Sequence, residues 1–349
     1  DLASPAGMVL GQPGSGKSLA VKLEIAQVML GTQDDIVIID PEGEYTPLVQ
    51  ALGGQVVEIS SGSTAHLNPM DITEDYADAD NPLILKSQFL QTFCELVVGG
   101  GGISAAERTY IDRAARLTYA KYFNSPSKQE MPCLQDFYDN LTAQGPGAGD
   151  IATALSIYVD GSMDVFAHHT NVDMSSRLVC FNTVKLGKPL QTLGMTVVLD
   201  QIWNRITLNR TTGRRTWIYT DEFQLLLRDK ECMNYYFEIS GRARKWGAIL
   251  TSITQHVESI LLDEDARRML SDCQYIKLLN QAPLDAQQLG KLLKISPEEL
   301  DYITNVNAGS GLLIAGNAVV PFTNDLPTDT ELYKLMDTNP NSAKTMTRI

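Results

Sequence analysis

The chain has 349 residues, with 28 Lys and Arg against 42 Asp and Glu, so its formal net charge is −14. This length suffices for one large or two ordinary domains, and the hydrophobic fraction of 44% excludes collagenous, low-complexity and wholly disordered chains. The acidic total argues against a surface that binds nucleic acid everywhere, although it leaves room for a local basic channel.

The first predicted strand, 7–10, leads into GQPGSGKS at 11–18 and an amphipathic helix at 19–30. The middle segment matches the phosphate-loop pattern G-x-x-x-x-G-K-[ST], in which glycines let backbone amides surround phosphate oxygens. Lys17 is expected to reach the β- and γ-phosphates of ATP, and Ser18 to offer its hydroxyl to Mg²⁺. The flanking strand and helix N-terminus disfavour a fortuitous Gly-rich turn. The predicted nucleotide-binding residues are Gly11, Gln12, Pro13, Gly14, Ser15, Gly16, Lys17, Ser18 and Leu19.

Two more strands are predicted at 35–40 and 55–59. The first ends in an acidic turn that carries Asp40, Glu42 and Glu44, and its carboxyl end is expected beside the nucleotide. One of these acids is therefore a candidate auxiliary polarising carboxylate. A plain turn is the alternative, because a proline and a glycine already explain the bend.

A different composition follows, with an acid-rich stretch at 71–80 that we expect to be a solvated surface linker. No strand-like run appears beyond it until after residue 159, and three segments have helical character. The helices are predicted at 83–98, 104–123 and 134–142, with a capping box formed by Ser104 and Glu107. We therefore predict an all-α insertion in an α/β core. The expected boundaries are 1–72 for the first part of the core, 73–165 for the insertion and 166–349 for the second part.

The next predicted strands are 177–182 and 216–221, and the second ends in TWIYTDEF, a pair of acids after an apolar run. In a nucleotide-hydrolysing site, Asp221 would orient Mg²⁺ through water and Glu222 would polarise the attacking water as general base. A turn or helix cap is the alternative for an isolated Asp-Glu pair. The phosphate loop upstream favours the catalytic role.

The last predicted strands are 248–253 and 274–279. Gln255 follows the former, where it would contact the γ-phosphate or the attacking water, or else cap the following helix. The preceding segment GRARKWG contains Arg242 and Arg244, which are either part of a solvated helix end or an arginine finger for a neighbouring subunit.

Alternation of apolar strands with helices is typical of a mainly parallel sheet with helices on both faces. No apolar stretch approaches the roughly 18 residues that a transmembrane helix needs. The five cysteines lie at least 39 residues apart, and no basic-then-apolar leader opens the sequence, so we expect reduced thiols and the cytosolic side of a membrane.

Several further segments accompany these motifs. They are VIIDPEGEY (37–45), HLNPMD (66–71), RLVCFNTVKLG (177–187), VLDQIWNRI (198–206), RARKWGAILTSITQ (242–255) and PFTNDLPTDTELYKLMDTNP (321–340). Together with the phosphate loop and YTDEF, this set resembles the conjugation ATPases of type IV secretion systems. It looks like the C-terminal ATPase domain of the TraC/TraE type, the VirB-four class, of a Gram-positive conjugative element. The resemblance covers nearly the whole chain.

The resemblance implies a RecA-like P-loop core of the HerA/FtsK kind that hydrolyses ATP, with Mg²⁺, to ADP and phosphate. It also implies hexamers that dock with other secretion components on the cytoplasmic face of the membrane. The chain would be a piece of a longer protein, and a monomeric state of this piece is the alternative to the hexamer. The functional positions it implies are Lys17, Ser18, Asp221, Glu222, Gln255 and one of Arg242 and Arg244, with Arg214 and Arg215 as a further candidate pair.

Two alternatives stay open. A DNA-pumping translocase or coupling protein shares every nucleotide motif, and a non-hydrolysing scaffold would use ATP only as an assembly switch. Residues 203–247 hold nine Lys and Arg against five Asp and Glu, a local charge of 9 − 5 = +4 that permits DNA inside a ring.

Overall fold

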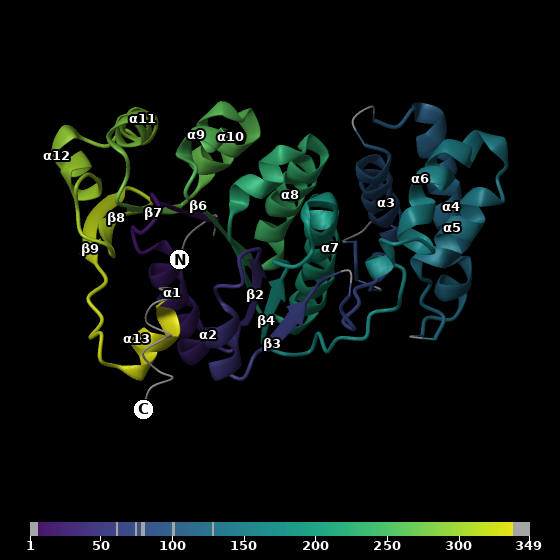
Figure 1. Cartoon of the computed structure of the whole chain (residues 1–349), viewed down its shortest axis with the longest axis horizontal. Coiled ribbons are helices and arrows are strands. Elements are labelled where there is room, and N and C mark those ends of the chain that lie inside the picture. The colour runs from purple at the N-terminus through teal and green to yellow at the C-terminus, as the bar shows by residue number, and fades with distance from the viewer. Residues whose placement is uncertain are drawn as a thin grey trace.

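The computed structural model describes residues 6–60, 62–73, 75–77, 81–99, 102–127 and 129–337. This part of the chain forms one sheet in the order β3-β4-β2-β5-β6-β1-β7-β8-β9 (Figure 1). The strands are β1 (Gly7–Leu10), β2 (Asp35–Asp40), β3 (Gln55–Glu58), β4 (Leu178–Asn182), β5 (Thr216–Thr220), β6 (Ala248–Thr254), β7 (Tyr275–Leu279), β8 (Ser310–Ala315) and β9 (Ala318–Thr323). Every pairing from β3 to β7 is parallel, and β8 and β9 add antiparallel strands at one edge.

The α/β class is confirmed, and all seven predicted strands are present with small changes at their ends. The antiparallel pair β8 and β9 was not predicted. Its strands flank a tight turn at Gly316, whose φ is +59°, and β9 is half-exposed at the sheet edge. Pro321 in β9 suits that edge, because proline has no N–H to donate to a further strand.

Helices cover both faces of the sheet. On β2, Ile36 and Ile38 pack with α1 (Lys17–Gly31) and α2 (Thr46–Ala51) on one face. The alternate residues Val37 and Ile39 pack on the other face, in the cluster that contains α7 (Lys188–Thr212) and α8 (Lys230–Ala243). Because successive side chains of a strand point to opposite faces, burial on both faces requires the continuous apolar run seen in the sequence.

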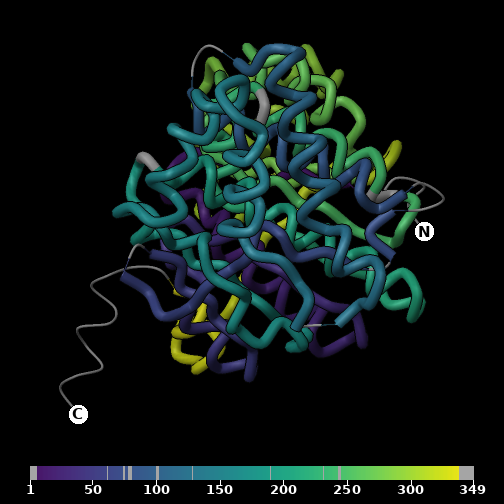
Figure 2. The backbone as a smooth tube through the Cα atoms, turned by 90° about the vertical axis from the view of Figure 1, so that its right-hand side faces the viewer, coloured from purple at the N-terminus to yellow at the C-terminus, as the bar shows by residue number. Residues whose placement is uncertain are grey.

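Four helices occupy the chain between β3 and β4, and no strand is found among its described residues. They are α3 (Pro82–Val98), α4 (Ala105–Asn124), α5 (Leu134–Thr142) and α6 (Gly149–Val159). Figure 1 shows them together beside the sheet, and Figure 2 views the molecule from their side. The three helices predicted here are present, and Ser104 and Glu107 form the expected capping box.

The remaining helices follow β6. They are α9 (Val257–Leu262), α10 (Glu264–Asp272), α11 (Pro283–Leu293), α12 (Pro297–Leu300) and α13 (Glu331–Met336). Short 3-10 turns complete the chain, among them η3 (Phe223–Arg228) after β5 and η4 (Arg244–Trp246) before β6. None of the helices in the described ranges is long and apolar enough to cross a bilayer.

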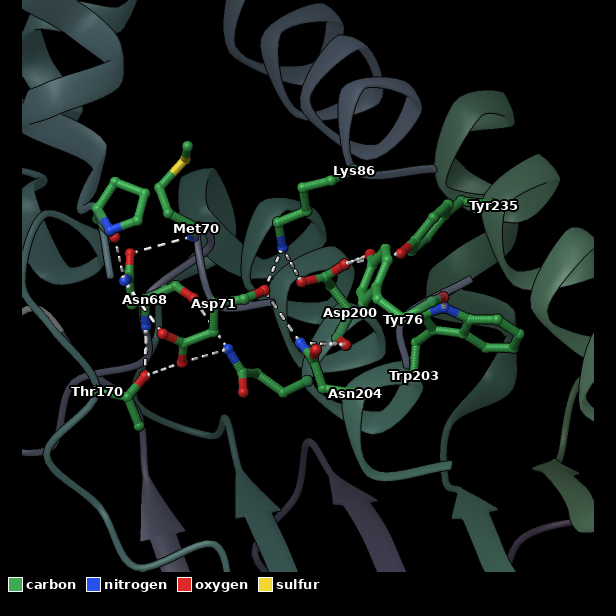
Figure 3. Close-up of polar contacts among 12 residues, drawn as sticks. Asn68, Met70, Asp71, Tyr76, Lys86, Thr170, Asp200, Trp203, Asn204 and Tyr235 are labelled. Carbon is green, nitrogen blue, oxygen red and sulfur yellow. Dashed lines mark hydrogen bonds and ion pairs between the residues drawn. The ribbon is translucent and has the colours of Figure 1, made fainter. Parts of the chain in front are cut away.

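The prediction that 71–80 is a solvated linker is wrong for most of its described residues, of which only Asp75 is exposed; 74 and 78–80 lie outside the described residues. The carboxylate of Asp71 accepts hydrogen bonds from Thr170 at 2.5 Å and from Gln201 at 3.1 Å. Tyr76 is buried, and its hydroxyl donates to Asp200 (Figure 3). Acid-rich composition predicted exposure, but here an acid and a tyrosine join the helices to the core.

A buried ion pair forms the centre of this contact. Lys86 on α3 is fully buried, and its Nζ lies 2.5 Å from Oδ2 of Asp200 on α7 and 2.7 Å from the carbonyl oxygen of Asp71 (Figure 3). Tyr235 on α8 donates to Asp200 at 3.2 Å. Burial raises the pKa of Asp200 and lowers that of Lys86, while the two charges stabilise each other. The pair thus connects α3, α7 and α8.

Candidate nucleotide-binding site

The phosphate loop forms the turn between β1 and α1, at the carboxyl edge of the parallel strands. Gly14 and Gly16 have φ values of +76° and +91°, in the left-handed region that favours glycine. A Cβ at Gly16 would also lie 2.7 Å from the backbone nitrogen of Gly309, which donates to the carbonyl oxygen of Ser15 at 2.8 Å. The motif therefore needs its last glycine both for backbone conformation and for contact with the chain before β8.

Lys17 lies within this loop. Its Nζ donates to the carbonyl oxygens of Gly11 at 2.7 Å and Gln12 at 3.2 Å. Burial lowers the pKa of Lys17, and the opposing Coulombic contributions come from acidic side chains. In decreasing order these are Asp221, Glu222, Glu44 and Glu42. The ammonium group is thus electrostatically coupled to both predicted catalytic acids and to the acidic turn after β2.

Asp221 follows β5 directly and is 6% exposed. Its backbone N–H donates to the carbonyl oxygen of Ile39 at 3.1 Å, so the strand register positions it beside the end of β2. Burial raises the pKa of Asp221 to about 8, with further contributions from neighbouring carboxylates, Glu222 first. A carboxylate buried among other acids suits a site that a cation completes.

Glu222 has φ +48°, a conformation uncommon for a residue with a side chain. Two glutamine side chains hold its carboxylate. Nε2 of Gln255 lies 3.2 Å from Oε1 of Glu222, and Nε2 of Gln224 donates to Oε2. Thr254, the last residue of β6, donates its hydroxyl to Oε1 of Gln224 at 2.5 Å. Gln224 was not predicted, although a polar residue within the apolar segment FQLLLR is a signal that could have indicated it.

The structure brings Lys17, Asp221, Glu222 and Gln255 to one edge of the sheet. They follow β1, β5 and β6, and β6 lies between the other two strands in the sheet. Because these strands are parallel and in register, their carboxyl ends meet at the same edge. The prediction that strand ends would gather these side chains rests on this geometry.

The acids of the turn after β2 differ in their contacts: the carboxylate of Asp40 is bonded to the backbone, whereas those of Glu42 and Glu44 are not within the described residues. Asp40 is fully buried and accepts hydrogen bonds from the backbone N–H groups of Glu44 and Tyr45, both at 3.0 Å, so it caps the turn. Burial raises the pKa of Asp40, and burial with the charges of nearby acids raises that of Glu42. Oε2 of Glu44 is buried without a hydrogen-bond partner in the described part of the chain. Glu42 and Glu44 thus keep their carboxylates available near the loop.

The candidate arginines lie elsewhere. Arg242 is near the C-terminal end of α8, where it pairs with Glu238 at 3.8 Å, and it precedes β6. The seven-residue strand β6 spans roughly 20 Å. Arg242 therefore precedes the amino end of β6, whereas the phosphate loop follows the carboxyl end of the neighbouring parallel strand β1. The side chain of Arg244 lies outside the described residues, and Arg214 pairs with the buried Asp35 at 3.2 Å.

The loop also offers an unused hydrogen-bond donor to an anion. The hydroxyl oxygen of Ser15 is buried and has no hydrogen-bond partner among the described residues, which leaves a donor within the loop. Across the same residues, no cluster of three or more His, Cys, Asp or Glu side chains is arranged to hold a metal ion by itself.

Comparisons with known proteins agree with this architecture. Residues 7–79 match the family model described as the central domain of the helicase HerA. No curated protein matches the sequence. Among solved structures, VirB4 of Thermoanaerobacter pseudethanolicus is similar, with a TM-score of 0.79 and 23% identity over 93% of this chain and 90% of that chain.

The bacterial conjugative coupling protein TrwB is also similar. Its sulphate complex has a TM-score of 0.60 and 16% identity over 95% of this chain and 87% of that chain. Its complex with the non-hydrolysable ATP analogue ADPNP has a TM-score of 0.56 and 17% identity over 93% and 88% of the two chains. The chain therefore has the P-loop α/β fold of VirB4 and TrwB, and its resemblance to the VirB-four class is confirmed at the level of the fold.

Proposed function

We propose that the chain is an ATP-hydrolysing motor subunit of a conjugative type IV secretion system. One observation carries the proposal: Lys17, Asp221, Glu222 and Gln255 gather at one sheet edge, beside a loop whose glycines suit phosphate. The fold shared with VirB4 supports the secretion role, and the ATP-analogue complex of TrwB supports nucleotide binding.

In the proposed reaction, the loop amides and Lys17 bind the β- and γ-phosphates of ATP. Mg²⁺, held by Ser18 and through water by Asp221, would neutralise phosphate charge when bound. To reach the phosphates, Lys17 exchanges its contacts with the carbonyl oxygens of Gly11 and Gln12 for phosphate oxygens. The buried Asp221 gives up its proton when a cation is present.

Glu222 accepts a proton from water as the water oxygen attacks the γ-phosphorus. The bond from the γ-phosphorus to the β–γ bridging oxygen breaks, and ADP and phosphate leave. Gln255, which donates to Glu222, would orient that water. Glu42 or Glu44 is proposed as an auxiliary carboxylate, because both act on the charge of Lys17.

We further propose that catalysis requires a ring, with hexamers as the expected assembly. Arg242 stands at the opposite sheet edge from its own loop, so it would serve a neighbouring subunit's nucleotide. Docking with other secretion components on the cytoplasmic face of the membrane, and transfer of DNA or protein, belong to the same proposal.

The experiment is ATP turnover measured against protein concentration, for the unmodified chain and for Lys17→Ala and Glu222→Gln. The rate per subunit should rise with concentration, because a finger supplied by a neighbour contributes on the order of a thousandfold or more. Both substitutions should reduce turnover by about a hundredfold or more. Unchanged turnover in either variant would contradict the assignment of the site.

A second candidate is a DNA-pumping coupling protein, favoured by the similarity to TrwB. Adding duplex or single-stranded DNA to the same assay separates the two, because a translocase should show strong stimulation and steep salt dependence. A non-hydrolysing scaffold is a weaker alternative, since a pure assembly switch needs no Glu222. Oligomer size that depends on ATP, without turnover, would identify it.

A further inference from the structure

Gln224 has a more restricted geometry than its place in a surface turn would suggest. A carboxylate can only accept hydrogen bonds, so the amide nitrogen of Gln224 must face Glu222. Its oxygen then faces Thr254, whose hydroxyl must donate. That hydroxyl oxygen accepts in turn from the backbone N–H of His256 at 3.0 Å. The four groups form one chain of hydrogen bonds with a single direction.

This series of hydrogen bonds ends on Glu222, the proposed general base. Gln224 donates to Oε2 of Glu222, while Nε2 of Gln255 lies 3.2 Å from Oε1 and 3.5 Å from Oε2. Two amide donors, one from η3 and one after β6, restrain the orientation of the carboxylate. The backbone of Glu222, at φ +48°, is a conformation that persists only where its surroundings maintain it.

Packing does not explain the side chain of Gln224. It is half-buried and lines an open cavity of about 490 Å³ between η3 and α9, whose other lining residues include Arg228 and Ser259. A side chain at the wall of an open cavity fills no core. The polar contacts with Glu222 and Thr254 therefore account for its orientation.

We propose that Gln224 is a positioning residue, which fixes the orientation of the Glu222 carboxylate for proton abstraction by coupling it to the end of β6 through Thr254. The inference rests on the proposed function. It predicts that Gln224 affects the chemical step and leaves nucleotide binding unchanged, because no hydrogen bond joins Gln224 to the phosphate loop in the described residues.

The test measures kcat and KM for ATP with the full chain at concentrations where turnover per subunit is maximal. Gln224→Leu, which is similar in size, should reduce kcat by about tenfold to a hundredfold and change KM less than about twofold. Thr254→Val, which removes the donor from the other side, should reduce kcat by a smaller factor. Arg228→Gln in the same turn, which loses a contact with Gln191, is the matched control and should behave like the unmodified protein.

A double variant separates positioning from a merely structural role. In the Glu222→Gln background, Gln224→Leu should cause no further decrease in the residual rate, because Gln224 acts only through Glu222. The proposal would be overturned if Gln224→Leu reduced the rate by the same factor in the Glu222→Gln background as in the unmodified protein. It would also be overturned if Gln224→Leu alone raised KM and left kcat unchanged. Melting temperatures within a few degrees of the unmodified protein establish that each variant is folded.

The two proposals fail in different ways. If Glu222→Gln removes turnover but Gln224→Leu leaves kcat unchanged, the positioning role is wrong and the proposed function stands. If Lys17→Ala and Glu222→Gln retain full turnover, the proposed function itself is wrong, and the positioning role falls with it.

Discussion

Asp221 is a residue of the candidate site whose pKa departs strongly from its ordinary value. Burial raises the pKa of Asp221 to about 8 in the folded chain. Between the ordinary pKa of about 4 and this value, the folded chain keeps a proton that the unfolded chain releases. For an acid with a raised pKa, stability is highest at low pH and is lost as pH rises from the unfolded pKa, about 4, to the folded one. Ionisation of the buried carboxylate therefore destabilises the folded chain, and a bound cation would offset this destabilisation.

Asp221→Asn tests this expectation. The amide is neutral at every pH, so the variant should be more stable than the unmodified protein, by an amount that grows between pH 5 and 8. The growth is at most about 1.4 kcal/mol per pH unit. Urea unfolding without nucleotide and Mg²⁺ at several pH values measures it. A constant difference across this range would show that Asp221 does not carry the proton.

At the same scale, motif spacing predicted Lys17, Asp221, Glu222 and Gln255 correctly as neighbours, because parallel strands bring their carboxyl ends together. It did not identify Gln224, whose only signal is a polar residue within the apolar segment FQLLLR. The contact of Gln224 depends on the left-handed backbone of Glu222 and the tight turn of η3, which no pattern in the sequence specifies. The roles of these residues in catalysis stay predictions until they are measured.

At the scale of elements, the fully buried strands were the easiest to predict. β2, for example, is buried at every position, and its apolar run has no other explanation at that length. β8 and β9 were missed although the sequence carries two apolar runs, SGLLIA and AVVPFT, separated by the Gly-Asn pair that is typical of a hairpin turn. The acid-rich linker was misjudged because composition does not reveal which acids have partners.

The buried pair of Lys86 and Asp200 makes a specific prediction about how the helices join the core. Lys86→Met leaves Asp200 buried without its cation and should destabilise the protein by about 3–5 kcal/mol. Lys86→Met combined with Asp200→Asn removes both charges while keeping an acceptor for Tyr76, so it should regain much of that loss. Urea unfolding measures both. Losses that simply add in the double variant would show that the two charges do not compensate each other.

At the scale of the whole molecule, the proposed role of Arg242 as a finger predicts that a neighbouring subunit completes the site. Lys17→Ala and Arg242→Ala should each be nearly inactive alone. A mixture should regain about a quarter of the unmodified rate, because some interfaces then pair an intact loop with an intact arginine. ATP turnover of the mixture measures this, with the exposed Arg267→Ala as control. A mixture no more active than the mean of its parts would contradict a finger from Arg242.

The positions of β3 and β4 have a consequence for how this fold is assembled. The two strands are neighbours in the sheet, yet the chain between them passes through α3, α4, α5 and α6. With the insertion boundaries we propose, 73 and 165, the helices resemble a module grafted at a single point of the core. They are not a removable one: a trimmed core would retain Asp200 on α7 without Lys86. Any minimal version of this fold must therefore replace the contacts that Tyr76 and Lys86 make with Asp200 before the helices can be removed.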